Sequence, residues 1–165
     1  MDQIILDTNF VSILFDARRP NHDVARLRAQ AFGRSDLVYL SAVVLAELRY
    51  GMEAAQRAGQ DVTHIRQTLS RAASYPLAEV GRHTAEAYGD VKARLADHYL
   101  DLTRRPPRWL EDWQERGSAK TLQVDENDLW IVAQAVERDY LLVTSDRRLA
   151  DRFAPAIKEL RLSVV

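Results

Sequence analysis

The stretch that most constrains the fold runs from residue 125 to residue 146, DENDLWIVAQAVERDYLLVTSD. Its first half predicts a helix from Asp125 to about residue 138, because apolar residues recur there at helical spacing and Asp is a good N-cap residue. Its second half contains a continuous apolar run, residues 140–143, which is typical of a strand buried on both faces of a parallel sheet. A helix that leads directly into such a strand indicates an α/β protein.

The same alternation of short apolar runs and amphipathic segments continues through most of the chain. Apolar runs that predict strands occupy residues 3–6, 37–40, 75–80 and 160–165. Helical spacing predicts helices over residues 10–15, 42–58, 61–73, 82–102 and 147–153, and over a segment with Val24, Leu27 and Ala31 on one stripe. We therefore expect an α/β fold, a three-layer α/β/α sandwich with a central parallel sheet. The length of 165 residues suits a single domain over residues 1–165.

Composition excludes several classes of protein. The chain has no cysteine, which excludes disulfides, thiolate zinc sites and cysteine nucleophiles. It shows neither the pattern of a secretory leader nor a long uncharged apolar run, so we expect a cytoplasmic protein that does not enter a membrane. The net charge is −1, whereas proteins that bind nucleic acid are usually basic. A role on nucleic acid would therefore depend on a local basic patch or on bound cations.

Four acidic residues occupy comparable positions at the ends of the predicted elements. Asp7 comes directly after a predicted strand, and Asp146 lies just beyond the end of another. Glu47 and Asp128 lie early in helices. Taken singly, each position has an ordinary explanation, because an acid can start a turn, cap a helix or complement the helix dipole. Glu47 fits such an explanation least: it shares a stripe with apolar residues, where a carboxylate is costly unless it pairs, for instance with Arg49, or binds a metal.

Taken together, the four acids predict a metal site. The carboxyl ends of parallel strands meet at one edge of a sheet, so we expect these side chains to gather there. Four carboxylates in one place would raise each other's pKa unless cations lay among them. Oxygen ligands without thiolates suit Mg²⁺ or Mn²⁺, and these ions support hydrolysis of a phosphodiester by water. Nearby hydroxyl and amide groups are expected to hold the carboxylates or the water in place: Thr8, Asn9, Asn127 and Thr144.

The predicted helix 42–58 has an unusual distribution of apolar residues. Residues 42–48 are apolar on nearly every side of the helix, with Glu47 as the exception. Such a helix either lies deep in the core or exposes one face to a partner.

Residues 103–120 interrupt the alternation of strands and helices, and we treat them as a basic, aromatic insertion (the 103–120 segment). Trp109 and Trp113 are four residues apart, so the chain from Trp109 to Arg116 is expected to form one or two helical turns. Two interpretations are open. Either the segment holds RNA through its arginines and aromatic rings, or it is a surface excursion whose tryptophans pack back on the domain. The candidate RNA-binding residues are Arg104, Arg105 and Arg108.

Four segments resemble the signature blocks of PIN domains. They are residues 5–9 (ILDTN), 46–51 (AELRYG), 127–133 (NDLWIVA) and 143–146 (VTSD), in the order that the family has them. Each block alone is weakly specific, but the four together extend over nearly the whole chain. Within the family, the sequence is most similar to the VapC-type toxins of bacterial toxin–antitoxin pairs.

The resemblance implies a Mg²⁺- or Mn²⁺-dependent endoribonuclease built on a central parallel sheet. Asp7, Glu47 and Asp128 match the three core acids of the family, and Asp146 matches the fourth, more variable one. Thr144 matches the supporting hydroxyl. We therefore expect the four acids to be catalytic and to bind the metal. The resemblance also implies a homodimer and a small antitoxin that docks over the site. The 103–120 segment is longer than the family's compact pattern, which leaves the path of the RNA open.

Two other functions remain open from the sequence. One is a housekeeping PIN ribonuclease that has no antitoxin. The other is a module of the same fold that binds RNA or a protein without cleaving it, although the presence of all four acids gives no support to a loss of catalysis. A neighbouring small reading frame that encodes a DNA-binding protein would favour the toxin–antitoxin pair.

Overall fold

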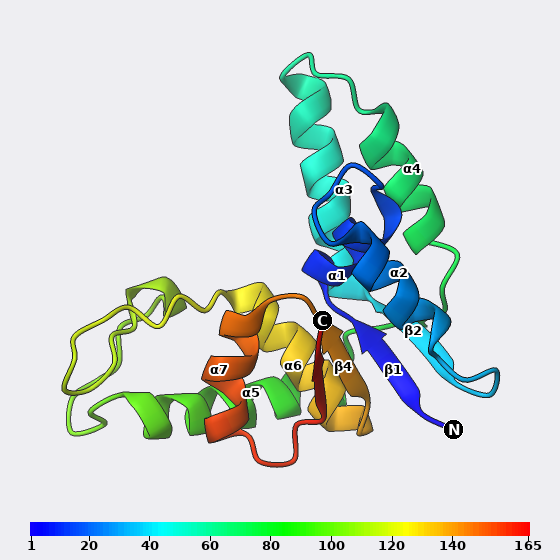
Figure 1. Cartoon of the computed structure of the whole chain (residues 1–165). Coiled ribbons are helices and arrows are strands. Elements are labelled where there is room, and N and C mark those ends of the chain that lie inside the picture. The colour runs from blue at the N-terminus through cyan, green and yellow to red at the C-terminus, as the bar shows by residue number, and fades with distance from the viewer.

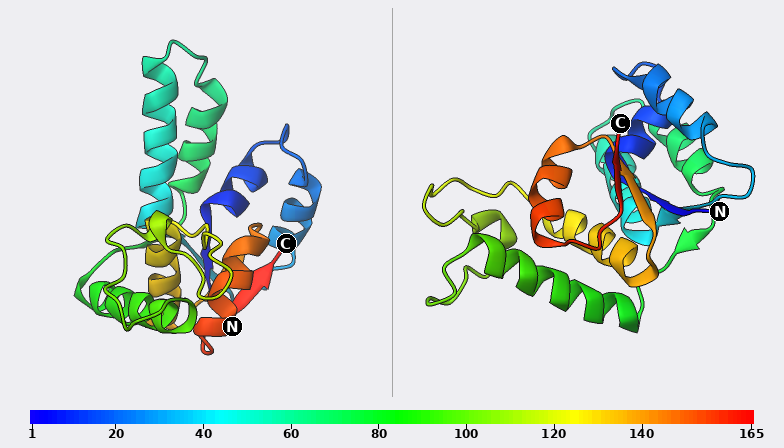
Figure 2. Two further views of the ribbon diagram at one scale, coloured as in Figure 1. Left: turned by 90° about the vertical axis from the view of Figure 1, so that its left-hand side faces the viewer. Right: turned by 60° about the horizontal axis from the view of Figure 1, so that its bottom comes forward.

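The computed structural model describes residues 1–165, which form a five-stranded parallel sheet between two layers of helices (Figures 1 and 2). The strands lie in the order β3-β2-β1-β4-β5. Their bounds are β1 Gln3–Leu6, β2 Leu37–Ser41, β3 Leu77–Ala78, β4 Leu141–Thr144 and β5 Leu162–Val164. All neighbouring strands are parallel. The sequence-based prediction of an α/β sandwich with a parallel sheet is therefore confirmed.

Seven helices cover the sheet. They are α1 Thr8–Phe15, α2 His22–Gln30, α3 Ala42–Arg57, α4 Thr63–Ala72, α5 Arg82–Tyr99, α6 Glu126–Arg138 and α7 Arg147–Ala156. Helices α1 to α4 pack with one another on one side of the sheet, and α5 packs with α6 and α7 on the other side (Figures 1 and 2). Helices α3 and α4 form a hairpin that extends past the sheet (Figure 1). No helix has both the length and the apolar character needed to cross a membrane.

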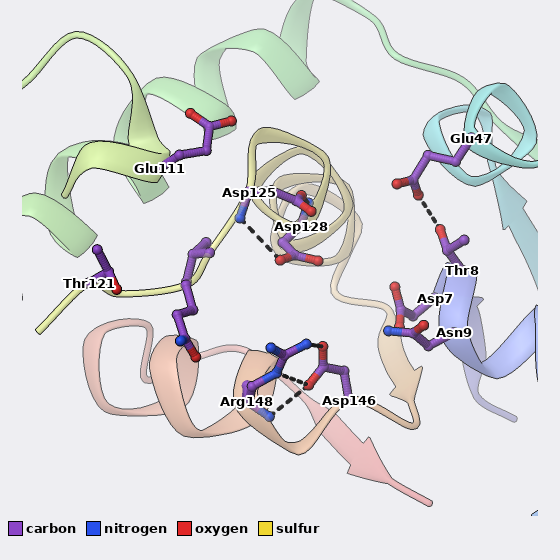
Figure 3. A pocket seen from close by; sticks show the side chains of 12 residues that line it. Asp7, Thr8, Asn9, Glu47, Glu111, Thr121, Asp125, Asp128, Asp146 and Arg148 are labelled. Carbon is purple, nitrogen blue, oxygen red and sulfur yellow. Dashed lines mark hydrogen bonds and ion pairs between the residues drawn. The ribbon is translucent and has the colours of Figure 1, made fainter. Parts of the chain in front are cut away.

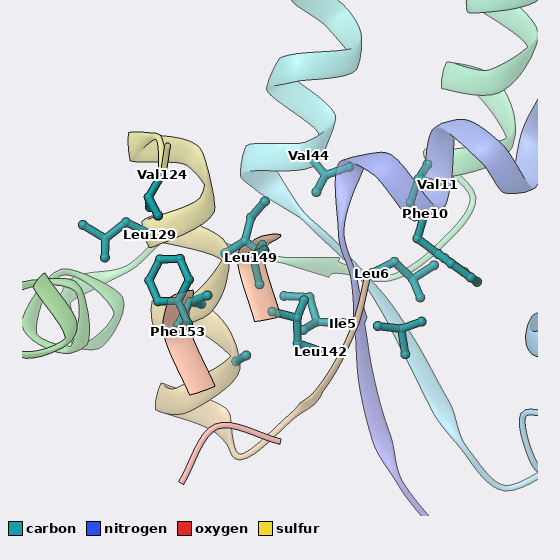
Figure 4. Packing of buried hydrophobic residues seen from close by; sticks show 14 of the residues in the cluster. Ile5, Leu6, Phe10, Val11, Val44, Val124, Leu129, Leu142, Leu149 and Phe153 are labelled. Carbon is teal, nitrogen blue, oxygen red and sulfur yellow. The ribbon is translucent and has the colours of Figure 1, made fainter. Parts of the chain in front are cut away.

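The core forms where the central strands bury both of their faces. Ile5 and Leu6 of β1 and Leu142 of β4 are fully buried. Phe10 of α1 packs on one side of these strands, and Phe153 of α7 packs on the other (Figure 4). Such two-sided burial explains why β1 and β4 are continuous apolar runs rather than alternating ones.

The strand order fixes where a site can form. From β1 the chain moves to β2 and β3 on one side, and later returns to β4 and β5 on the other. The carboxyl ends of β1 and β4 are therefore adjacent, and the connections that leave them diverge. In open α/β sheets, a crevice forms at such a switch point. The backbone N–H of Asp7 still donates to the carbonyl of Val143 at 3.0 Å, so the pairing of the two strands continues up to this edge.

The transition from α6 to β4 lies one residue later than the sequence pattern predicts. Asp139 has a φ of 53°, the left-handed conformation that often ends a helix. The N–H of Tyr140 then donates to the carbonyl of Ala135 at 2.9 Å, so Tyr140 closes the helix and the strand begins at Leu141.

The predicted helix with Val24, Leu27 and Ala31 on one stripe is α2, and this stripe lies at the surface. Val24 and Leu27 are 50% and 60% exposed, and Ala25 is the residue that the helix buries. This helix packs mainly on α1 at the outside of the molecule, so its apolar stripe exceeds the surface available to cover it. The chain from Trp109 to Arg116 forms a short 3₁₀ turn, Leu110–Asp112, instead of α-helical turns. Residue 114 then forms an isolated bridge with residue 121, which turns the chain back on itself.

Candidate active site

A cavity of about 480 Å³ opens at the carboxyl edge of the sheet, where β1 and β4 end (Figure 3). Its walls come from the starts of α1, α6 and α7, from α3, and from the chain that leads into α6. The lining residues are Asp7, Thr8, Asn9, Glu47, Glu111, Thr121, Gln123, Val124, Asp125, Asp128, Asp146 and Arg148. The four acids that the sequence singles out thus line one cavity, although they lie up to 139 positions apart in the chain.

Asp7 is the most buried of these acids, with 2% of its surface exposed. It follows β1 directly and precedes α1, so its backbone is fixed by the sheet on one side and a helix on the other. Thr144 of β4 donates its hydroxyl hydrogen to Asp7 Oδ2 at 2.8 Å. Burial nevertheless raises the pKa of Asp7 to about 6, because the desolvation of the carboxylate outweighs the hydrogen bonds that it accepts.

Glu47 reaches the cavity from α3. Its carboxylate accepts a hydrogen bond from Asn127 Nδ2 at 2.8 Å and another from the hydroxyl of Thr8. The alternative partner considered from the sequence, Arg49, contacts Glu53 instead, at 3.6 Å. Glu47 therefore lies against side chains at the starts of α1 and α6.

Asp128 lies in the first turn of α6 and also acts as part of its cap. Its backbone N–H donates to Asp125 Oδ1 at 2.9 Å, and the N–H of Asp125 donates to Asp128 Oδ2 at 3.3 Å. This reciprocal pair is a capping box. Burial, with the negative charges of Asp125, Asp7 and Asp146, raises the pKa of Asp128 to about 7. Because helix capping by itself favours the charged form, the raised pKa reflects burial and the crowding of acids in the cavity.

Asp146 is the N-cap residue of α7. Its Oδ1 accepts a hydrogen bond from the backbone N–H of Arg148 at 2.8 Å. Its own N–H donates to the Thr144 hydroxyl oxygen at 2.9 Å, and that hydroxyl is the one that donates to Asp7. Thr144 thus connects the acids at the ends of the two central strands.

The remaining polar residues singled out from the sequence lie close to these acids. Thr8 and Asn9 line the cavity, while Asn127 lies beside it and contacts Glu47. None of the four histidines lines the cavity. His22 is an example, since its Nδ1 lies 2.9 Å from the carbonyl of Ile13.

The sequence pattern did not single out three charged residues of the cavity as site residues. Asp125 was identified only as a helix cap, and its position three residues before Asp128 could have indicated a second role. Arg148 follows Asp146 by two residues, which puts it in the first turn of the same helix. Glu111 lies in the 3₁₀ turn of the 103–120 segment, where no periodic pattern predicts the direction of a side chain.

The proposed RNA-binding arginines do not line the acidic cavity. Arg104 and Arg105, together with Arg116, line a second cavity of about 490 Å³ that is formed entirely by residues 100–119. The guanidinium of Arg108 lies 4.8 Å from the ring centre of Trp109, whose surface is 57% exposed.

Trp113, in contrast, is 3% exposed and anchors the 103–120 segment. Its Nε1–H donates to the carbonyl of Pro107 at 3.0 Å, and Lys92 of α5 lies over its ring. One tryptophan therefore packs back on the domain and the other does not.

The acids of the cavity suit a divalent cation by their chemistry. As they stand, no three His, Asp or Glu side chains are close enough together to hold a metal ion, since the carboxylates are turned toward Thr8, Asn127, Arg148 and the start of α6. However, six carboxylates share the cavity with a single arginine, and the pKa of both Asp7 and Asp128 is raised. An excess of oxygen ligands with uncompensated charge fits Mg²⁺ or Mn²⁺.

The chain is similar to known proteins both in sequence and in fold. The chain is 28% identical to the VapC ribonuclease Y4jK of Sinorhizobium fredii over 143 residues, which cover 87% of this chain and 86% of that protein. Its fold is similar to that of VapBC2 from Rickettsia felis, solved bound to a promoter DNA fragment, with a TM-score of 0.67, 16% identity and 98% of each chain covered. It is also similar to VapBC-5, a member of the VapBC family of toxin–antitoxin systems from Mycobacterium tuberculosis, with a TM-score of 0.60, 24% identity and 100% of each chain covered.

A match to a family model extends over most of the chain. Residues 4–154 match the PIN domain, and this range includes the strands and helices from which the acidic cavity is built. The chain therefore belongs to the PIN domain family.

Proposed function

We propose that this protein is a metal-dependent endoribonuclease that acts as the toxin of a toxin–antitoxin pair. The observation that carries the proposal is the acidic cavity of a PIN domain, in which Asp7, Glu47, Asp128 and Asp146 come from four separate segments of the chain. The similarity to a protein named as a VapC ribonuclease supports RNA as the substrate.

The four acids would hold Mg²⁺ or Mn²⁺, each from a different wall of the cavity. When bound, such an ion would polarise the phosphodiester and activate the water that attacks it. Asp7 offers the most rigid ligand, because strand pairing and the Thr144 hydroxyl fix its position. Asn127 and Thr8 orient Glu47, and the backbone N–H of Arg148 at the start of α7 orients Asp146.

A cognate antitoxin is part of the proposal. The VapBC proteins of similar fold include a member of a family of toxin–antitoxin systems. This similarity supports an antitoxin as the partner of this chain. This chain also has an apolar cavity of about 420 Å³ between α3 and α4, lined by Ala42, Leu45, Ala46, Arg49, Leu69 and Ala73. The outward face of α3 therefore offers apolar surface to a partner, which is one of the two alternatives that the composition of residues 42–48 left open. We propose in addition a single PIN domain over residues 1–165, a homodimer and a cytoplasmic location.

The experiment is cleavage of total cellular RNA by the purified protein with Mg²⁺ or Mn²⁺, with EDTA, and with the Asp7→Asn variant. We expect discrete fragments that require the metal and that the variant does not produce. Asn retains an oxygen that can accept the Thr144 hydroxyl hydrogen, so the variant tests the charge of the ligand rather than the fold. An absence of cleavage by folded protein supplied with metal would contradict the ribonuclease proposal and favour a module that binds RNA or protein.

A further inference from the structure

The acidic cavity contains one basic side chain. Among its lining residues, Arg148 is the only arginine, lysine or histidine. The acidic residues that it accompanies are Asp7, Glu47, Glu111, Asp125, Asp128 and Asp146. A nucleic-acid phosphate that entered such a cavity would be repelled by every charged group except bound cations and this guanidinium.

Arg148 contacts Asp146 loosely (Figure 3). Its Nε lies 3.4 Å from Asp146 Oδ1, and its Nη2 lies 3.3 Å from Asp146 Oδ2. These distances exceed the roughly 2.7–2.9 Å of a strong charge-assisted hydrogen bond. The Arg148 side chain is 69% exposed, whereas that of Asp146 is 16% exposed. The guanidinium is therefore held beside the acids and remains open to a ligand from solvent.

The position of Arg148 is fixed through the main chain. Its backbone N–H donates to Asp146 Oδ1. Asp146 is the N-cap residue of α7 and lies two residues after the end of β4. Asp146 is in turn connected to Asp7 through Thr144. The side chain of Arg148 therefore leaves the first turn of α7 in a defined direction, toward the cavity, while the bonds near its guanidinium can still rotate.

Arg148 has more N–H donors than its contacts with Asp146 occupy. A guanidinium carries five N–H donors in a planar fork that matches the oxygens of a phosphate. The contacts with Asp146 involve two of its nitrogens, which leaves the N–H groups of Nη1 and one of Nη2 free to donate. The adjacent Arg147 provides a contrast: both arginines are exposed, but Arg147 does not line the cavity and forms no ion pair.

We propose that Arg148 binds a backbone phosphate of the RNA substrate in the acidic cavity, with Asp146 holding its guanidinium in place. This inference rests on the proposed ribonuclease function. Arg148 would attract the negatively charged RNA backbone into a cavity that is otherwise acidic. The phosphate would be bound in a fixed orientation by paired N–H donors, beside the carboxylates that would hold the metal.

The test measures RNA binding without cleavage. A short fluorescein-labelled single-stranded RNA is titrated in EDTA with the Asp7→Asn protein and with the same protein carrying Arg148→Ala, Arg148→Lys or Arg147→Ala. We expect Arg148→Ala to weaken binding and to reduce the slope of log K against log salt by about 0.7, the change for one phosphate of a single strand that is no longer neutralised. Arg148→Lys should keep the slope, because the charge remains. Arg147→Ala should leave the affinity and slope unchanged.

The results separate this inference from the proposed function. If RNA binds and Arg148→Ala has an unchanged slope, or if Arg147→Ala has the same effect, Arg148 does not bind phosphate while the ribonuclease proposal stands. If no variant binds RNA in EDTA, the inference about Arg148 fails, and the cleavage assay with metal decides the ribonuclease proposal. Folding is checked by circular dichroism, and we expect no change because the cap of α7 uses the backbone N–H of residue 148. Arg148→Gln gives the same comparison should the alanine variant unfold.

Discussion

Two cavities of nearly equal volume, about 480 and 490 Å³, each include residues of the 103–120 segment in their lining, but they are built in opposite ways. The acidic cavity collects residues from five parts of the chain, most of them at the ends of strands and helices. The other cavity, which we call the arginine cavity, is formed by residues 100–119 alone, without regular structure on most of its wall. Its basic residues are Arg104, Arg105 and Arg116.

This difference matches two kinds of chemical task. Hydrolysis of a phosphodiester requires several groups held in fixed relative positions, which strand ends and helix starts provide. Contact with the backbone of a flexible polyanion requires positive charge but tolerates variation in geometry. The acidic cavity is thus suited to chemistry, and the arginine cavity is suited at most to binding. The following predictions test that division, from the largest expected effect to the smallest.

Substitution of an acid should affect the rate far more than substitution of an arginine. Asp7→Asn is expected to lower the cleavage rate by roughly 10²–10³, by analogy with the loss of other electrostatic stabilisers. Arg105→Ala, the control from the arginine cavity, should change the rate constant for bound RNA little. Single-turnover cleavage at saturating enzyme measures both. Equal losses in the two variants would mean that the division into chemistry and binding is wrong.

The two tryptophans of the 103–120 segment provide a matched pair for stability. Trp113→Ala removes a buried ring and its hydrogen bond to Pro107, and should lower the free energy of unfolding by about 3 kcal/mol or more. Trp109→Ala removes an exposed ring and should change it by less than about 0.5 kcal/mol. Chemical denaturation measures both. A small effect of Trp113→Ala would show that the segment is not anchored to the domain.

The buried charge of Asp7 should make the metal-free protein less stable at high pH. Its pKa is about 6 in the folded protein and 3.8 ordinarily, so the folded state binds the proton more tightly. The contribution of Asp7 should therefore be lost as the pH rises from about 4 to 6 and stay constant above that, while Asp128, whose pKa is about 7, adds a loss that continues to about pH 7. Asp7→Asn should remove this loss, worth about 2–3 kcal/mol at pH 8 and nothing below pH 4, given about 1.4 kcal/mol per pKa unit.

Thermal unfolding in EDTA across this pH range checks the prediction. Asp90→Asn, at an acid whose side chain is 63% exposed on α5, is the control and should leave the stability profile unchanged. A profile of Asp7→Asn that parallels the wild-type one would contradict the uncompensated charge that we infer in the cavity.

The arginines of the 103–120 segment should have the smallest effect, and only on binding. Replacement of Arg104, Arg105 and Arg108 by Ala should weaken RNA binding and flatten its salt dependence by about 0.7 for each phosphate that these side chains neutralise. Arg26→Ala, on α2 at the other side of the sheet, is the control. If the triple variant binds RNA with an unchanged dependence on salt concentration, the 103–120 segment does not bind RNA and is ordinary protein surface.

The sequence predicted the acidic cavity better than it predicted the 103–120 segment, for a physical reason. Asp7 and Asp146 each follow a continuous apolar run, and parallel pairing of those runs brings their ends together. The pattern therefore carries information about three-dimensional position. Glu111 lies in an irregular turn whose direction depends on the packing of Trp113 and Leu110, which no local periodicity encodes.

Two other details were also beyond local patterns. The apolar stripe of α2 does not indicate which residue is buried, and Val24 and Leu27 are exposed because α2 packs mainly on α1. The contact between Arg148 and Asp146 depends on the turn of helix that Asp146 caps, and a run of two arginines after an acid does not indicate which one turns inward. Tertiary packing determines which of these side chains are buried or point into the cavity.

The most direct test of the account is the position of a divalent cation. Crystals grown with Mn²⁺ should give an anomalous difference peak in the acidic cavity, beside Asp7 and Asp146, and the carboxylates of Glu47 and Asp128 should have turned from their present partners toward it. The same peak should be absent from Asp7→Asn crystals. A wild-type crystal saturated with Mn²⁺ that shows no peak in this cavity would contradict the proposal that these four acids form a metal-dependent nuclease site.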